Sequence, residues 1–193
     1  MFILVLGLIL FLGVHSTRIF AEGWRTQTIA RVGEKPWKGV YSVVSLLGFA
    51  LIIWGFGIAR QQPVVLWSPP VAMKHLNSLF TLLAFVLLAA AYVPRNQIRS
   101  RLHHPMVLGV KLWAFGHLLA TSTLANAVLF GAFLLWAILD FRAARQRDRA
   151  LGTVYQPGTL AGTLMAVVAG LVAWAAFAFW AHAAWIGIAP LGR

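Results

Sequence analysis

The chain has 193 residues, of which 61% are apolar and only 10% are charged, and its formal net charge is +12. Soluble domains carry charged residues at about a quarter of their positions, so this composition excludes an ordinary soluble domain. The sequence contains no cysteine, which excludes disulfides, Cys-ligated iron–sulfur clusters, thiolate ligation of haem and cysteine nucleophiles. The positive charge does not indicate nucleic-acid binding, because most Lys and Arg residues lie in short segments between long apolar runs.

These apolar runs predict six transmembrane helices. The first run follows Met1 without a preceding basic segment, so we expect a retained first span rather than a cleaved signal peptide. Short connections predict that the helices form a compact all-α bundle and a single domain over residues 1–193. In chain order the predicted spans are Phe2–Phe20, Gly39–Ala59, His75–Val93, His103–Ser122, Leu124–Phe141 and Leu160–Ile188.

The connecting segments differ in character. Ala21–Lys38 mixes basic residues with two tryptophans, which is typical of a loop or a short helix in the headgroup region. Arg60–Lys74 is predicted to be a turn interrupted by prolines, and Arg95–Arg101 a short basic loop. A second basic segment, Arg142–Arg149, is expected to follow the fifth span.

The distribution of basic residues predicts the orientation of the chain in the membrane. The connections between spans one and two, three and four, and five and six hold most of the Lys and Arg residues, whereas the opposite side holds Arg60, Lys74 and Arg193. Cytoplasmic loops are enriched in Lys and Arg, so both termini are expected on the non-cytoplasmic side.

The fourth predicted span carries three ionisable residues at membrane depth, His104, Lys111 and His117. A charge at the bilayer centre costs about 2.5 kcal/mol or more, so such residues need a partner or a function. At about 100° per residue, Lys111 falls within roughly 20° of His104 on one helix, whereas His117 lies about 140° away. His104 and Lys111 therefore form one candidate constellation, and His117 belongs to another face.

Further histidines lie in other spans, and their depth limits which of them can cooperate. His15 lies in the last third of the first span, and His117 lies about 20 Å further along the helix axis than His104. Depth alone pairs His15 with His104, and His117 with His182 or His75. Neutral imidazole is a common axial ligand of haem iron, and ligation by two histidines needs no cysteine. A haem between the helices would therefore explain the intramembrane histidines.

Each of these residues also has an ordinary structural interpretation. A buried histidine is often hydrogen-bonded within a bundle, and the Lys111 amine can extend towards the interface. His75, His103 and His182 lie near predicted interfaces, where polar residues are tolerated.

Signatures of soluble enzymes are absent from the sequence. There is no Gly-rich phosphate loop and no GxSxG motif. Asp140 and Asp148 are the only acidic residues outside the first connection, which disfavours paired-carboxylate catalysis and carboxylate-rich metal sites.

Four motifs follow one another along nearly the whole chain. They are FLGVHSTRIF around His15, GEKPWKGVYSVVSLLG from Gly33, WSPP with KHLNSL from Trp67, and AAAYVPRNQIRSRLHHPMVLGVKLWAFGHLLAT from Ala89 to Thr121. Together they resemble the NnrU family of bacterial membrane proteins. This resemblance implies a multi-pass protein of the bacterial inner membrane that is linked to denitrification, where nitrite and nitric oxide are reduced.

The NnrU family is in turn similar to the plant zeta-carotene isomerase, a membrane haem b protein with histidine ligands that isomerises a cis double bond. Transferred by motif, the resemblance implies haem b with His15 and His117 as metal ligands. His104 and Lys111 are further candidate cofactor-binding residues, and the pairing of His15 with His104 by depth stays open. The implied partners are the lipid bilayer and a hydrophobic small-molecule substrate, with no nucleic acid.

Two other functions are compatible with the sequence. His104-Pro105 followed by Leu108-Gly109 is similar to the RHPxYxG stretch of isoprenylcysteine methyltransferases, which contacts S-adenosylmethionine. That stretch has Arg where this chain has His103 and Tyr where it has Val107. A non-enzymatic role as a membrane assembly partner is the third interpretation.

Overall fold

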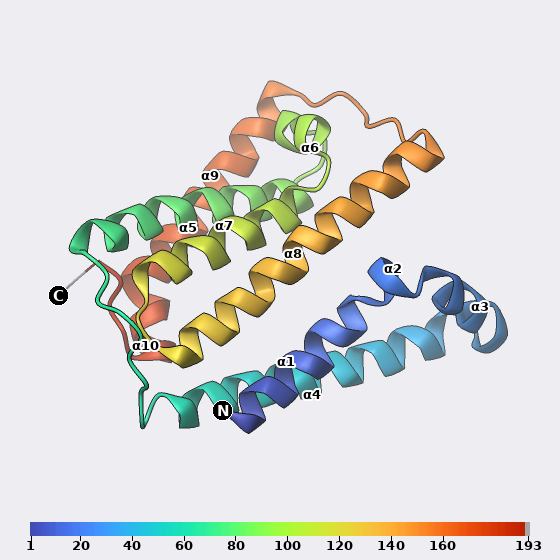
Figure 1. The fold of residues 1–193 in the computed structure, drawn as a ribbon. Helices are drawn as coiled ribbons and strands as arrows, with labels where there is room; N and C mark the ends of the chain where they lie inside the picture. Colours follow the sequence, from blue (N-terminus) through green and yellow to red (C-terminus); the bar gives the residue numbers. More distant parts are fainter. Residues whose placement is uncertain (192–193) are drawn as a thin grey trace. The chain divides into compact units, whose positions relative to one another are not determined.

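The computed structural model describes residues 1–191, and this part of the chain is almost entirely helical (Figure 1). Arg193, which contributes to the predicted charge asymmetry, lies outside the described residues. Residues 1–191 form no β-strand, although two isolated bridges join Val65 to Thr123 and Asn96 to Thr159. The all-α class is therefore confirmed for the described part of the chain.

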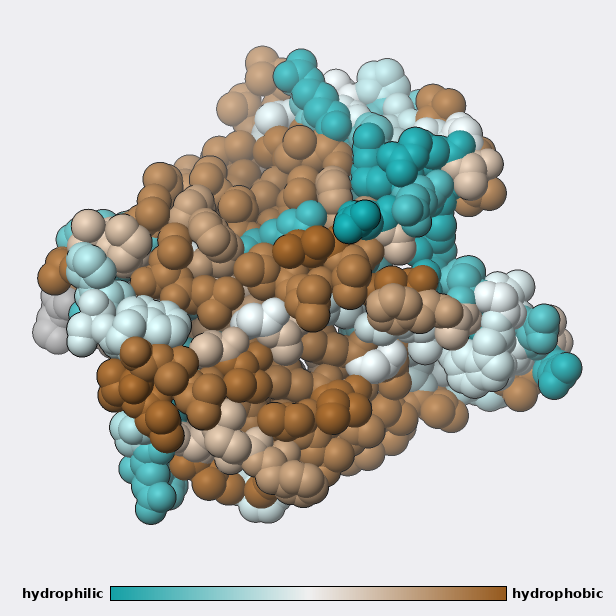
Figure 2. All heavy atoms as spheres, viewed as in Figure 1, coloured by the Kyte–Doolittle hydropathy of each residue, from teal (hydrophilic) through white to brown (hydrophobic). Residues whose placement is uncertain are grey.

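Among the described residues, four helices are long and apolar enough to cross a membrane. They are α4 (Glu34–Ala59), α5 (Val71–Tyr92), α8 (Leu124–Leu151) and the continuous helix Leu160–Ile186. Large apolar side chains on them are exposed, and apolar residues cover much of the face shown in Figure 2. Water does not tolerate this much contiguous apolar surface, so the chain is a membrane protein.

Two of the six predicted spans correspond to shorter apolar helices. These are α1 (Phe2–His15), with 14 residues, and α7 (Pro105–Ala120), with 16 residues. At about 1.5 Å per residue each is shorter than the roughly 30 Å hydrocarbon core. Six spans and the side on which the termini lie therefore stay predictions.

The described residues fall into two compact units. Unit 1 comprises Met1–Trp67 and Ser122–Ala144, and unit 2 comprises Ser68–Thr121 with the described residues from Arg145 onward. Helix α8 contributes its first part to unit 1 and its C-terminal part to unit 2. The expectation of one domain over residues 1–193 stays a prediction.

In unit 1, α1 packs along α4 through glycines (Figure 1). A Cβ atom on Gly48 would lie 2.6 Å from the Phe11 backbone nitrogen, and one on Gly7 would lie 2.6 Å from that of Ile52. Gly7 on α1 therefore faces Ile52 on α4, whereas Phe11, further along α1, faces Gly48, which comes earlier in α4. The two helices are therefore antiparallel. Because glycine has no side chain, the two backbones approach closely at these positions, as is common between membrane helices.

The first predicted span ends earlier than Phe20. Helix α1 stops at His15, and the Ser16 and Thr17 hydroxyls donate to the carbonyl oxygens of Leu12 and Val14. Such bonds compete with the regular helical pattern and favour a break. The chain continues as α2 (Thr17–Phe20) and α3 (Glu22–Val32), so the connection contains a short helix, one of the two forms expected.

In unit 2, α5 lies between α7 and α9 (Leu160–Ala176) and contacts both (Figure 1). A Cβ atom on Gly109 of α7 would lie 3.0 Å from the Ala84 carbonyl oxygen, and one on Gly170 of α9 would lie 2.5 Å from the Val86 Cα. The last helix passes through a π-helical turn, η1 (Phe177–Ala181), before α10 (His182–Ile186).

Two expectations about the basic segments are wrong. Most of the predicted basic loop Arg95–Arg101 belongs to the helix α6 (Gln97–Leu102). Asn96 caps this helix by accepting a hydrogen bond from the Arg99 backbone at 2.7 Å. Helix α8 does not end at Phe141 but continues through Arg142–Arg149, because Ala, Arg and Gln are favourable helix residues.

Candidate functional site

The His15 side chain lies among aromatic rings in unit 1. Its ring stacks on Phe11 with centroids 4.3 Å apart, and it lies 5.2 Å from the Tyr41 ring and 6.1 Å from the Trp136 ring. His15 Nδ1 is 2.6 Å from the Phe11 carbonyl oxygen, which can only accept a hydrogen bond. Nδ1 therefore carries the proton, and Nε2 carries the lone pair that a metal ligand requires.

His117 shows the same arrangement in unit 2. Its Nδ1 donates to the Trp113 carbonyl oxygen, four residues earlier, at 2.8 Å, and its ring lies 5.5 Å from that of Trp113. His182 belongs to the same unit, and its Nδ1 donates to the Ile188 carbonyl oxygen at 2.6 Å. Depth pairs His117 with His182 or His75, and all three histidines belong to unit 2, so both pairings stay predictions.

The remaining candidates lie at the start of α7. His104 is the N-cap residue, with φ −119° and ψ 60°, so it lies outside the helix and the calculated angle to Lys111 does not apply to it. Lys111 lies within α7 and is half-buried. His15 belongs to unit 1, whereas His104, Lys111 and His117 belong to unit 2.

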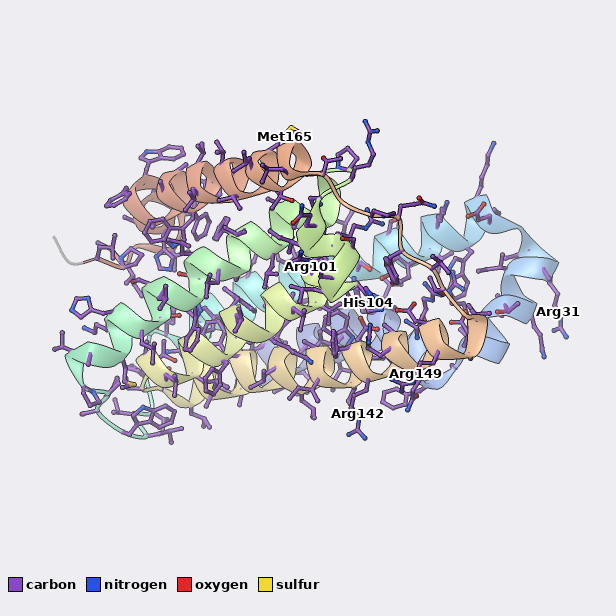
Figure 3. The ribbon with its side chains drawn as sticks, turned by 90° about the horizontal axis from the view of Figure 1, so that it is seen from above. Arg31, Arg101, His104, Arg142, Arg149 and Met165 are labelled. Atoms are coloured by element: carbon purple, nitrogen blue, oxygen red, sulfur yellow. The ribbon has the colours of Figure 1, made fainter. Side chains whose placement is uncertain are left out.

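His104 belongs to a polar cluster that sequence reasoning missed. Its Nε2 donates to Asp148 Oδ2 at 2.7 Å, and the same oxygen accepts from the Tyr155 hydroxyl at 3.0 Å. His103 stacks on Tyr155 with centroids 4.1 Å apart and planes 6° apart, and the Arg145 guanidinium contacts its Nδ1. Figure 3 shows His104 beside the start of α7, with Arg149 marking the C-terminal part of α8.

The cluster has two electrostatic consequences. Burial and the hydrogen bond to Asp148 raise the pKa of the Tyr155 phenol above its ordinary value. Arg145 places a cation at His103 Nδ1, which opposes metal binding there. Among residues 1–191, no group of three or more His, Asp or Glu side chains is arranged to hold a metal ion.

The long apolar helices and the absence of strands among residues 1–191 define the chain as an all-α membrane protein. The family model described as NnrU protein matches residues 3–190, nearly the whole chain. The chain therefore belongs to the NnrU protein family, which confirms the resemblance of its four motifs. Comparisons with curated proteins and with solved structures gave no match.

Proposed function

We propose that this protein is a multi-pass haem-b-binding protein of the bacterial inner membrane, with His15 and His117 as iron ligands. Its role lies in nitrite and nitric oxide metabolism or in cis–trans isomerisation of a hydrophobic substrate. The proposed topology has six spans, with α1 and α7 as the short ones and both termini on the non-cytoplasmic side.

The observation that carries this proposal is shared by the two histidines. Each donates its Nδ1 proton to the carbonyl oxygen four residues earlier, at 2.6 Å for His15 and 2.8 Å for His117. Metal-ligating histidines commonly hold the non-ligating nitrogen in such a bond, which fixes the tautomer and the ring orientation. His104 fits less well, because ligation through Nε2 would break its bond to Asp148.

The surroundings of His15 also fit a porphyrin. Phe11, Tyr41 and Trp136 offer aromatic faces and edges next to the imidazole. Bound haem would supply a redox-active iron with Lewis acidity. The chain would contribute the two oriented imidazoles and an apolar environment that excludes water.

Absorption spectra of the detergent-purified protein test this proposal. Wild type, His15→Ala, His104→Ala and His117→Ala are compared in the oxidised and dithionite-reduced states, with His75→Ala as a matched histidine control. We expect a Soret band with sharp reduced α and β bands, altered in His15→Ala and His117→Ala but not in His104→Ala or His75→Ala. A wild type that is colourless and stays colourless with added haemin would refute haem binding.

Incubation with different substrates distinguishes the two proposed roles, nitrite and nitric oxide metabolism and cis–trans isomerisation. Haem-loaded protein is incubated with nitrite, with nitric oxide, or with a conjugated polyene that contains one cis bond. A change in the polyene absorption spectrum that requires His15 and His117 favours the isomerase. Spectral shifts of the iron with nitrogen oxides alone favour the denitrification role.

The methyltransferase alternative predicts heat on titration with S-adenosylmethionine, and the assembly role predicts a co-purifying protein.

A further inference from the structure

Two polar atoms in unit 1 are buried and have no hydrogen-bond partner among the described residues, Ser45 Oγ and Trp136 Nε1. Leaving a buried donor unpaired costs about 1–3 kcal/mol, and such atoms are rare in native proteins. The penalty is not reduced by hydrocarbon, which offers no hydrogen-bonding groups. Their presence indicates a partner that the polypeptide itself does not supply.

Both atoms lie near the level of His15. Phe11 faces Gly48 across the antiparallel helices, so Ser45, three residues before Gly48, lies close to the level of His15, four residues after Phe11. Trp136 on α8 is placed there directly, because its ring lies edge-on to the His15 ring at 6.1 Å. The two atoms therefore come from different helices of unit 1 and share a level with the candidate iron ligand.

The chemistry of the two atoms defines the missing partner. An indole N–H can only donate, and a hydroxyl can donate as well as accept, so the partner must present an acceptor oxygen. A carboxylate is the strongest acceptor of this kind, because both oxygens accept and the charge strengthens each bond. Haem b carries carboxylates on the edge of its ring, within the same molecule that His15 would ligate.

We propose that the Ser45 hydroxyl and the Trp136 indole N–H donate hydrogen bonds to a carboxylate of the haem held at His15; this rests on the proposed function. Two basic side chains of the segment that follows α1 already have an anionic partner. Arg18 and Arg25 pair with Glu22 at 3.4 and 3.2 Å. Ser45 and Trp136 would thus position one edge of the porphyrin without forming a bond to the iron.

Haem titrations of variants test the proposal. Ser45→Ala and Trp136→Phe each remove one donor with little change in shape. Ser42→Ala and Trp54→Phe are matched controls, because both residues are exposed on α4. Each protein is titrated with haemin and with haemin dimethyl ester, in which the carboxylates are esterified and uncharged. The absorption spectrum of each complex reports whether the iron ligands are retained.

We expect each donor variant to bind haemin about tenfold more weakly than wild type, with an unchanged spectrum of the bound form, as loss of one charge-assisted bond implies. With the dimethyl ester, the difference between variant and wild type should largely disappear. The controls should match wild type with both ligands. Thermal unfolding of each protein without haem shows whether it is folded, and Ser45→Ala, the smaller change, suffices if Trp136→Phe does not fold.

The outcomes separate the two proposals. If wild type binds neither ligand, the proposed function fails and this inference fails with it. If wild type binds haemin and the donor variants bind it equally well, only the inference is overturned. Equal weakening with haemin and with the ester also overturns it, because the donors would then contact another part of the molecule.

Discussion

The His104 imidazole and the Asp148 carboxylate are separated by 44 positions in the sequence and by 2.7 Å in the structure. Their bond connects the start of α7 to the C-terminal part of α8 within unit 2. Tyr155 binds the same carboxylate oxygen, so the segment after α8 is attached at this point too. The side chains of His104 and Asp148 are only 20% and 17% exposed, which protects the bond from competition by water.

Replacing Asp148 by Asn should therefore destabilise unit 2. The variant keeps the shape but loses the charge on the acceptor, and we expect a loss of about 1 kcal/mol in the free energy of unfolding. Thermal unfolding in detergent measures this. The double-mutant cycle with His104→Ala isolates the pair, and effects that add to within about 0.3 kcal/mol would show that the two side chains do not interact.

Tyr155 predicts a dependence of stability on high pH. Its phenol pKa is raised above the ordinary value of 10.0, first by burial and then by the hydrogen bond to Asp148. The folded state thus favours the protonated phenol, and this contribution is complete below about pH 10 and lost as pH rises through the folded pKa. Tyrosine ionisation is followed by ultraviolet absorbance during a pH titration of wild type and of Tyr155→Phe. The difference between the two titration curves should have its midpoint above pH 10.0. A midpoint at or below that value would contradict the buried contact.

Asn96 predicts a larger effect on stability. It is 1% exposed, donates to the carbonyl oxygens of Ala90 and Val93 at 2.8 and 2.6 Å, and caps α6. Asn96→Ala should lower the free energy of unfolding by about 2 kcal/mol or more, because it leaves several buried groups unpaired. Gln97→Ala is the control, since the Gln97 backbone N–H rather than its side chain binds Thr163. Equal thermal stability of the two variants would argue against the network.

The apolar helices were predictable because their signal is local. Runs such as Gly39–Ala59 and His75–Val93 are long, and the observed helices α4 and α5 contain nearly all of both. The boundaries were less predictable, since hydroxyl bonds of Ser16 and Thr17 ended α1 early. The basic segments were predicted as loops from their charge alone. Arginine is compatible with helix and loop alike, and the structure has helix at α6 and at the end of α8.

The polar cluster was not predictable for a different reason. His104 and Asp148 were each noticed, but no periodic pattern joins positions on separate elements, and Tyr155 carried no signal at all. An aspartate that follows a transmembrane run, among arginines, was the only indication in the sequence that a specific partner existed. The tautomers of His15 and His117 also depend on carbonyl positions that only the folded helix fixes.

The contact between α1 and α4 predicts that alanine substitutions at two glycines of α4 have opposite effects on stability. A Cβ atom on Gly55 would collide with the Leu4 backbone, whereas one on Gly57 meets nothing within 4 Å. Gly55→Ala should therefore cost about 1–3 kcal/mol, because neither backbone can move aside without loss of packing. Gly57→Ala should be neutral or should stabilise by up to about 1 kcal/mol, since alanine favours the helix. Thermal unfolding of both variants in the same detergent compares them directly. If Gly55→Ala were as stable as Gly57→Ala, the close approach of α1 and α4 would be wrong, and with it the alignment that places Ser45 near His15.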